Sequence, residues 1–464
     1  MPDIMAAVAA CPLDEAVAFF LAPAPRFSAF QHDFEPLPVM NEVPASTAQP
    51  NRQALDEKRI SFPLRIPINL RKNSAEPANP APKMQQPANA SEDTNTKTAQ
   101  LVKLISEIGP DIPEISRRLG QFKESVRYRY KEKVLKKGLA IQAVVDYEKL
   151  GLKRLELVVD FASPFRQYAQ TIMVAMSELC YVTSFMKMFP RGSYVMAASV
   201  PDEYIDDFSK LMDSLYREGL FSDVRTHYFE WFRNMPMQAQ FYDFDNGRWD
   251  FDWSKKADVN PAGMTVDNPG RSKFDYIDLL ILKELQADAT RSMVDIAGKL
   301  KVNYKVLAWH LATHVIPRGL VRGYVVRWPG TRYDFKVEKA LHRQHRYSWV
   351  DVIATGISSK ESMSLASRMS SLPFVWSQAG GRDYFAELVL PVDFLTESLQ
   401  RVQEILSPVR DRAELYMMDQ TDALGFSIGY KLYDQAEKKW SFNASEVESK
   451  FSQMILKIKT ESQT

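Results

Sequence analysis

The stretch ISRRLGQFKESVRYRYKEKVLKKGL, residues 115–139, decides the fold, because the chain repeats its pattern as IAGKLKVNYKVLAWHLATHVIPRGL at residues 296–320. The two stretches align without a gap at an offset of 181 positions (296 minus 115). Five apolar or glycine positions of the first stretch recur at this offset, with at most a change of one apolar type: Ile115, Leu119, Val126, Gly138 and Leu139. Self-similarity of this kind indicates that the chain holds two copies of one module.

The first copy opens with a helical pattern. Apolar residues spaced three and four apart predict one helix around Leu101 and a second around Ile115. Gly120 then opens a tight turn, residues 123–137 form a third helix, and Gly138 ends that helix as a left-handed cap. Helix, helix, turn and helix are the helix-turn-helix arrangement. A wing strand is expected at 139–145.

The second copy repeats this plan, with helices expected at 276–285, 292–300 and 304–315. After each helix triplet, the pattern changes to a β-α-β-β-α-β order, which is that of the ferredoxin-like plait. We therefore predict an α+β fold made of two tandem copies of a winged helix-turn-helix plus a ferredoxin-like plait.

The organisation along the chain follows from this order. About half of the 27 prolines and none of the glycines lie in the first 97 residues, which predicts a disordered tail. The predicted segments are a disordered Pro-rich tail at 1–97, helix-turn-helix 1 at 98–150, plait 1 at 151–232, a linker at 233–272, helix-turn-helix 2 at 273–330, plait 2 at 331–435 and a C-terminal helix at 436–464.

Composition excludes several classes of protein. A net charge of +1 excludes a globally basic protein that coats nucleic acid by charge alone. Two cysteines, Cys11 and Cys180, cannot build a disulfide framework, so a reducing, cytoplasmic setting is expected. His310 and His314 lie four residues apart on one helix face, but no Cys, Asp or Glu near them in the sequence completes a metal site. No nucleophile elbow, phosphate loop or dinucleotide fingerprint is present. We predict no metal, no cofactor, no catalytic residues and no enzyme activity.

One family resembles this chain. YIDLLILKELQADA at 276–289, followed by RSMVDIAGKL at 291–300, is similar to the first two helices of the leucine-responsive regulator (Lrp/AsnC) family. The resemblance implies a transcription regulator that binds double-stranded DNA, pairs through its plaits and often senses an amino acid-like effector there. Gly380, Asp383 and Tyr384 match the family's effector-binding turn. The first copy departs from it, with Pro190, Ser193 and Tyr194 at these places.

DNA contacts are expected from the third helix of each copy, because that helix enters the major groove. The candidates are Lys123, Ser125, Arg127, Tyr128, Arg129 and Lys131 in copy one, and Asn303, Tyr304 and Lys305 in copy two. The basic excess of copy one predicts strongly salt-dependent binding. Arg127 is the candidate for pairing with guanine. A solvated basic helix face is the alternative explanation of the charge.

The resulting hypothesis is a sequence-specific regulator, cytoplasmic and associated with the nucleoid, that reads DNA mainly with its first helix-turn-helix. Its plaits pair within the chain as a pseudo-dimer or between chains as a homo-oligomer, and no membrane is involved. Two alternatives stay open. One is a tetrapyrrole enzyme like the sirohaem decarboxylases, with His227, His342 and His345 as candidate helpers. The other is an interaction scaffold that has lost DNA binding.

Overall fold

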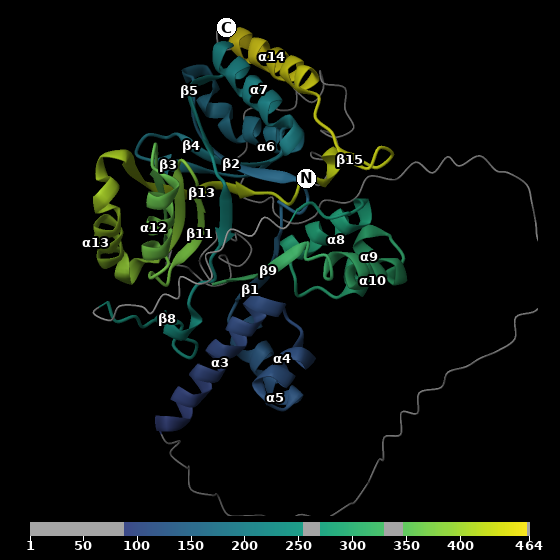
Figure 1. The fold of residues 1–464 in the computed structure, drawn as a ribbon, viewed down its shortest axis with the longest axis vertical. Helices are drawn as coiled ribbons and strands as arrows, with labels where there is room; N and C mark the ends of the chain where they lie inside the picture. The colour runs from purple at the N-terminus through teal and green to yellow at the C-terminus, as the bar shows by residue number, and fades with distance from the viewer. Residues whose placement is uncertain (1–87, 254–269, 329–346, 462–464) are drawn as a thin grey trace, which may run out of the picture.

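A computed structural model describes residues 88–253, 270–328 and 347–461 of the chain. Its largest element is a nine-stranded antiparallel sheet in the order β5-β2-β4-β3-β13-β10-β12-β11-β6 (Figure 1). The strands are β2 (Leu152–Phe161), β3 (Val182–Phe189), β4 (Tyr194–Pro201), β5 (Phe221–Tyr228), β6 (Trp231–Asn234), β10 (Tyr347–Ala354), β11 (Val375–Gly380), β12 (Tyr384–Pro391) and β13 (Ala413–Gly425). The prediction of an α+β fold is confirmed at this level.

Helices cover one face of each half of the sheet. The helices are α6 (Ala169–Leu179) and α7 (Ile205–Arg217) on the first half, and α12 (Ser359–Met369) and α13 (Leu395–Leu406) on the second (Figure 1). Strand alternation explains this, because successive side chains point to opposite faces. On β2, Leu155 and Leu157 pack in the core that holds α6 and α7, whereas Val158 packs in the core of the second half. Each half therefore has a helix-covered face and a helix-free face.

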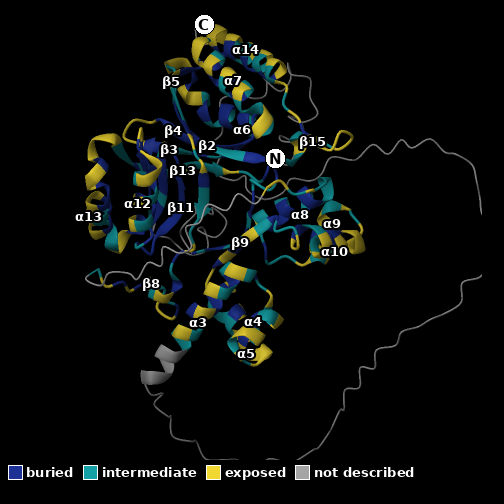
Figure 2. Cartoon of the chain, in the orientation of Figure 1, coloured by how far each residue is buried: buried dark blue, intermediate teal, exposed yellow. Residues whose placement is uncertain are grey.

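The two helix-free faces meet each other. Strand β5 lies at one end of the strand order and the β11–β12 turn lies near the other, yet His227 on β5 bonds to Asp383 in that turn. Arg225 on β5 likewise pairs with Glu414 on β13 at 3.0 Å. The sheet must therefore curl back on itself, and the interior between its halves is closed off from most of the solvent. Figure 2 shows buried strands in this region and exposed outer faces on α13 and α14 (Ala444–Glu461).

Two helix triplets lie beside the sheet (Figure 1). The first consists of α3 (Ala88–Ile108), α4 (Ile112–Leu119) and α5 (Lys123–Arg129), and the second of α8 (Tyr276–Ala287), α9 (Met293–Leu300) and α10 (Tyr304–His310). The strands that follow them, β1 (Ala140–Val145) and β9 (Val321–Arg327), pair with each other in antiparallel register. The predicted wings thus form one shared ribbon between the two copies.

Each helix triplet shares a hydrophobic core with the half of the sheet that does not directly follow it in the sequence. Leu101, Ile115 and Val126 of the first triplet belong to the same core as the second half of the sheet. Leu279 and Leu307 of the second triplet belong to the core of the first half, together with the face of α14 that packs on α7. The apolar surface of each triplet is therefore buried with the other copy's half of the sheet.

Three element boundaries differ from the expectation. Helix α3 begins at Ala88, inside the segment predicted as tail; residues 1–87 lie outside the described part. The third helix of each triplet changes into a π-helical turn, η1 (Tyr130–Leu135) after α5 and η6 (Leu311–Val315) after α10, which periodicity alone does not distinguish from an α-helix. Strand β6 crosses the predicted boundary between plait 1 and the linker, and the linker contains a small hairpin, β7 (Tyr242–Asp243) with β8 (Arg248–Trp249).

That hairpin is itself repeated. Strands β14 (Tyr433–Asp434) and β15 (Lys439–Trp440) form the same structure after the second half of the sheet. In both hairpins a Tyr ring packs against a Trp ring, with centroids 5.1 Å apart in the first and 5.4 Å in the second. The repeat therefore extends beyond the segments that the sequence comparison aligned. No helix in the part of the chain with assigned structure is long and apolar enough to cross a membrane.

Candidate active site

Three carboxyl groups meet between the helix-free faces, and we call them the acidic seam: Glu156 on β2, Asp351 on β10 and Glu387 on β12. Glu156 and Asp351 are almost fully buried, with 2% and 3% of their surface exposed, and Glu387 is partly buried. Asp351 and Glu387 stand directly opposite each other on neighbouring strands. Each acid occurs in a strand whose other residues are mainly apolar, so the position of the strand in the sheet places the carboxyl group in the interior.

Burial shifts the protonation of all three acids. It raises the pKa of Glu156, although the neighbouring Arg154 guanidinium acts against this. Burial, reinforced by the charges of Glu387 and Glu156, raises the pKa of Asp351 well above its usual value. For Glu387, burial and the charge of Glu156 raise the pKa to about 7. Like charges in a low-dielectric site cannot all ionise, so neutral carboxyls persist near neutral pH and can serve as proton donors.

The raised pKa of Glu387 predicts a pH effect on stability. In the unfolded chain this carboxyl loses its proton near its ordinary value of 4.5, but in the folded chain it does so only near 7. Its stabilising contribution is therefore complete below about 4.5 and is lost as pH rises through about 7. We expect the free energy of unfolding, measured by urea titration, to fall over this window. The variant Glu387→Gln should show a smaller fall; an unchanged pH dependence in this variant would contradict the assignment.

Basic groups flank the seam. The Arg154 guanidinium lies 2.9 Å from Glu156 and 4.8 Å above the ring of Phe232, and its side chain keeps 20% exposure. His227 stands opposite Glu156 in the strand register, and its Nδ1 lies 2.9 Å from Asp383 Oδ2. Burial raises the pKa of Asp383, but the bonds from His227 and the Gly356 amide outweigh it and lower the pKa overall. An ionised Asp383 thus orients the imidazole.

Two buried polar atoms, one in the acidic seam and one beside it, have no hydrogen-bond partner among the described residues. Among the residues whose placement is described, none lies within hydrogen-bonding distance of His227 Nε2 or Asp351 Oδ1. Buried polar atoms in native proteins are nearly always hydrogen-bonded to protein, water or ligand. A water molecule or a bound ligand would satisfy these two atoms.

The three residues predicted to bind an effector do not converge on one point. Asp383 joins the seam through His227. Tyr384 is buried and donates a hydrogen bond to Gln378 Oε1 at 2.7 Å, and Gly380 lies against Trp231 and Ser362. Effector binding at this turn stays a prediction.

The predicted DNA-contacting residues lie on the outer faces of α5 and η1, and at the start of α10. Tyr128 is 66% exposed and Tyr304 48%. Arg127 is paired with Glu124 at 2.5 Å, and Arg129 donates to Gln121 at 2.8 Å. Lys123, Ser125 and Lys131 are exposed; Asn303 caps α10 by accepting from the backbone N–H of Lys305. Their contact with DNA is untested by this structure.

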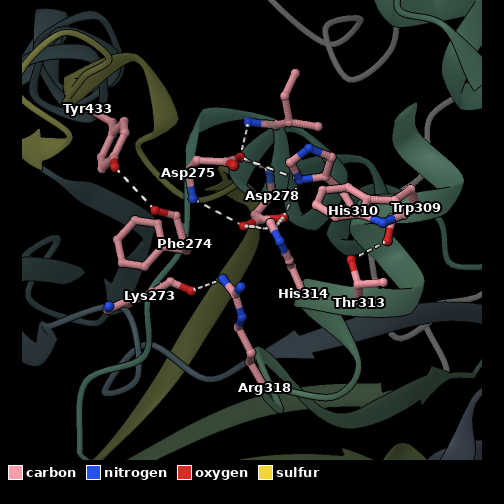
Figure 3. Close-up of polar contacts among 11 residues, drawn as sticks. Lys273, Phe274, Asp275, Asp278, Trp309, His310, Thr313, His314, Arg318 and Tyr433 are labelled. Carbon is pink, nitrogen blue, oxygen red and sulfur yellow. Dashed lines mark hydrogen bonds and ion pairs between the residues drawn. The ribbon is translucent and has the colours of Figure 1, made fainter. Parts of the chain in front are cut away.

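A second polar cluster brings together residues that are distant in sequence. Asp275 and Asp278, at the start of α8, lie against His310 and His314 (Figure 3). The sequence analysis considered only neighbours in sequence and therefore placed no acid beside the histidine pair. Packing of the first helix of the triplet against the third brings residues more than thirty positions apart together. His342 and His345 lie outside the described residues.

The acidic seam was also missed from sequence. A signal was present for Asp351 and Glu387, because each is the one charged residue of its strand. A charged residue at such a position has to find a partner or shift its pKa. Which acids meet, however, depends on the curling of the sheet.

Comparison with known proteins adds the following. No family model matches the chain, and no curated protein does. The chain is similar to a crystal structure of the siroheme decarboxylase NirDL, at 10% identity over 79% of this chain and 100% of that one, with a TM-score of 0.43. The chain is also similar to the same enzyme in complex with an iron-uroporphyrin III analogue, at 12% identity over 79% of this chain and 99% of that one, with a TM-score of 0.42. A third similar structure is that of an anthrone oxidase-like protein, at 6% identity over 62% of this chain and 98% of that one, with a TM-score of 0.28.

These findings correct two predictions. The chain was predicted to be a regulator of the Lrp/AsnC family and not an enzyme, whereas the first solved structures that it resembles are those of a decarboxylase. In the described residues, no observation supports DNA as a partner of the chain. Identities and TM-scores this low transfer no activity, so any function has to rest on the residues of this chain.

Proposed function

We propose that the chain is an enzyme whose reaction takes place at the acidic seam, and that it decarboxylates a tetrapyrrole of the sirohaem type. The observation that carries the proposal is the meeting of three desolvated carboxyls with an arginine and an aspartate-held histidine. Groups with strongly shifted pKa values in an interior site are candidates for acid–base catalysis. The seam also reaches solvent, because Arg154 and Asp383 each keep about a fifth of their side-chain surface exposed.

The chemistry of decarboxylation matches these groups. When a carboxylate leaves as carbon dioxide, its bonding electron pair stays on the carbon, and that carbon must receive one proton. A neutral Glu387 or Asp351 is a proton donor of suitable strength near neutral pH. The donor then regains its proton from solvent. Tetrapyrrole side-chain carboxylates are anions, and Arg154, which donates to Glu156 and keeps 20% exposure, supplies a positive charge beside the seam that attracts them.

We propose further that each copy is a winged helix-turn-helix joined to a ferredoxin-like plait. The strand orders β5-β2-β4-β3 and β13-β10-β12-β11 support this, since both halves use their strands in the same relative order. The two plaits then pair within one chain. This arrangement places acids from both copies in one site, Glu156 from the first and Asp351 and Glu387 from the second.

Incubation with sirohaem under anaerobic conditions tests the function. We expect the absorbance of the tetrapyrrole to shift on binding, and mass spectrometry to show loss of carbon dioxide from its side chains. An Arg154→Met variant should bind more weakly, since it loses the guanidinium but keeps much of the apolar stem. Sirohaem that shows neither a spectral shift nor a change in mass would overturn the proposal.

A further inference from the structure

The four side chains Asp275, Asp278, His310 and His314 present one ligand atom each, and these atoms lie within 4.8 Å of one another (Figure 3). His310 Nδ1 lies 2.9 Å from Asp278 Oδ1 and 3.6 Å from Asp275 Oδ1. His314 Nδ1 lies 3.2 Å from Asp278 Oδ2. In a tetrahedral zinc site with bonds of about 2.0–2.1 Å, neighbouring ligand atoms are about 3.3 Å apart. The observed separations bracket this value.

The backbone holds this arrangement in place. Asp275 is the N-cap of α8 and Asp278 completes the capping box, so both carboxylates are fixed by hydrogen bonds to backbone N–H groups. His310 ends α10 and His314 follows one turn later in η6, which places both imidazoles on one face. The exposed Trp309 packs against both rings, with centroids 5.0 Å and 4.7 Å away. The fold therefore holds the four ligand atoms close together.

Charge balance favours a divalent ion here. Asp278 has no exposed surface, and His310 keeps only 8%. The Asp275 side chain keeps 40% exposure, but burying the Asp278 carboxylate beside it is costly unless positive charge compensates the pair. One divalent cation with two carboxylates and two neutral imidazoles makes a neutral set. Mixed imidazole and carboxylate ligands suit zinc and its neighbours in the transition series, whereas magnesium and calcium prefer oxygen alone.

The other copy shows that this ligand set is not part of the general fold. At the offset of 181, the corresponding residues are Thr94, Lys97, Arg129 and Lys133 (275, 278, 310 and 314 minus 181). Three of these are cations, and Arg129 and Lys133 lie on α5 and η1 just as His310 and His314 lie on α10 and η6. Copy one therefore repels a divalent cation at this place. Any ion bound here belongs to copy two alone.

We propose that Asp275, Asp278, His310 and His314 bind one zinc ion, which ties the start of α8 to the end of α10. Four protein ligands leave no open coordination position, so the ion has a structural role. The second helix triplet would be stabilised by the ion, independently of the chemistry at the acidic seam. Binding would also require both histidines to be neutral, so affinity should fall at acidic pH.

Cobalt substitution tests the site on the full chain after treatment with a chelator. Four-coordinate Co²⁺ absorbs strongly in the visible region, and we expect one equivalent to produce this absorption and one equivalent of Zn²⁺ to abolish it. The chain's melting temperature should rise by several degrees with Zn²⁺. The double variant His310→Gln with His314→Gln should lose both effects, and circular dichroism establishes that it is folded.

Two further variants sharpen the test. His314→Gln alone replaces the less buried histidine and should weaken Co²⁺ binding at least tenfold even if the double variant misfolds. The matched control replaces His342 and His345, the other close histidine pair in the sequence, and should leave one tight ion per chain. The proposal is overturned if the wild-type chain gives no Co²⁺ absorption, or if the His314→Gln variant binds as tightly as the wild type. Such a result would mean that the cluster is only a hydrogen-bonded tie between the helices.

Discussion

Replacing Gly380 by alanine is expected to destabilise the folded chain by about 3 kcal/mol, because adding atoms to a tightly packed interior is costly. A Cβ at this position would overlap the Ser362 hydroxyl and lie 2.7 Å from Trp231 Cε2. Neither neighbour can withdraw easily, since Ser362 is fully buried in α12 and Trp231 is 7% exposed on β6. Strand β6 follows the first half of the chain but pairs with β11 of the second. The substitution therefore weakens the packing of β6 against β11 and α12.

Urea denaturation of the variant measures this effect, and Gly298→Ala is the matched control. Gly298 lies within α9, and a Cβ there would meet no atom within 4 Å. Alanine is favoured over glycine in a helix interior by about 1 kcal/mol, so this control should be slightly more stable than the wild type. Equal stability of the two variants would show that β6 is not packed against β11 as described.

The substitution Glu387→Gln is expected to lower the turnover of sirohaem by a factor of about 10² to 10⁴, which is the usual contribution of a general acid. Glutamine keeps the size of the side chain and its bond from Ser377, whose hydroxyl lies 3.1 Å from Glu387 Oε2. It cannot give up a proton to carbon. Because it also removes a charge that burial and Glu156 oppose, the variant should be more stable than the wild type above about pH 7.

Measuring both the turnover and the stability of the Glu387→Gln variant distinguishes a catalytic acid from a structural one. A structural carboxyl would lose stability when replaced, whereas an acid kept in an unfavourable environment for its chemistry gains stability and loses activity. Glu404→Gln, on the exposed side of α13, serves as the control and should change neither quantity. A Glu387→Gln variant with wild-type turnover would remove this residue from the mechanism.

Local sequence patterns predicted much of the fold. The spacing of apolar residues located the helices around Leu101 and Ile115, and it also located the helix predicted at 292–300, which the structure places at Met293–Leu300. These features depend on residues close together in the chain. The same patterns gave no indication that Ile115 packs with the second half of the sheet, because the sharing of this core is decided by packing between distant segments.

The two polar clusters show why the sites were harder to predict. His310 and His314 were recognised as a pair, since their spacing is a local property, but Asp278 reaches them only through the packing of α8 against α10 and η6. Glu156 and Asp351 meet only because the sheet curls. The surface residues of α5 were predicted to contact DNA, and their exposure alone does not establish that they do.

The central claim is that the acidic seam decarboxylates a tetrapyrrole, and a single-turnover experiment with sirohaem tests it most directly. Wild-type chain and the Glu387→Gln variant are each mixed with a limiting amount of sirohaem, and its mass is followed with time. We expect both proteins to shift the absorbance of the bound tetrapyrrole, the wild type to remove carbon dioxide from it, and the variant to leave its mass unchanged over the same period. A wild-type chain that binds sirohaem without changing its mass, or a variant that acts at the wild-type rate, would rule out decarboxylation at the acidic seam.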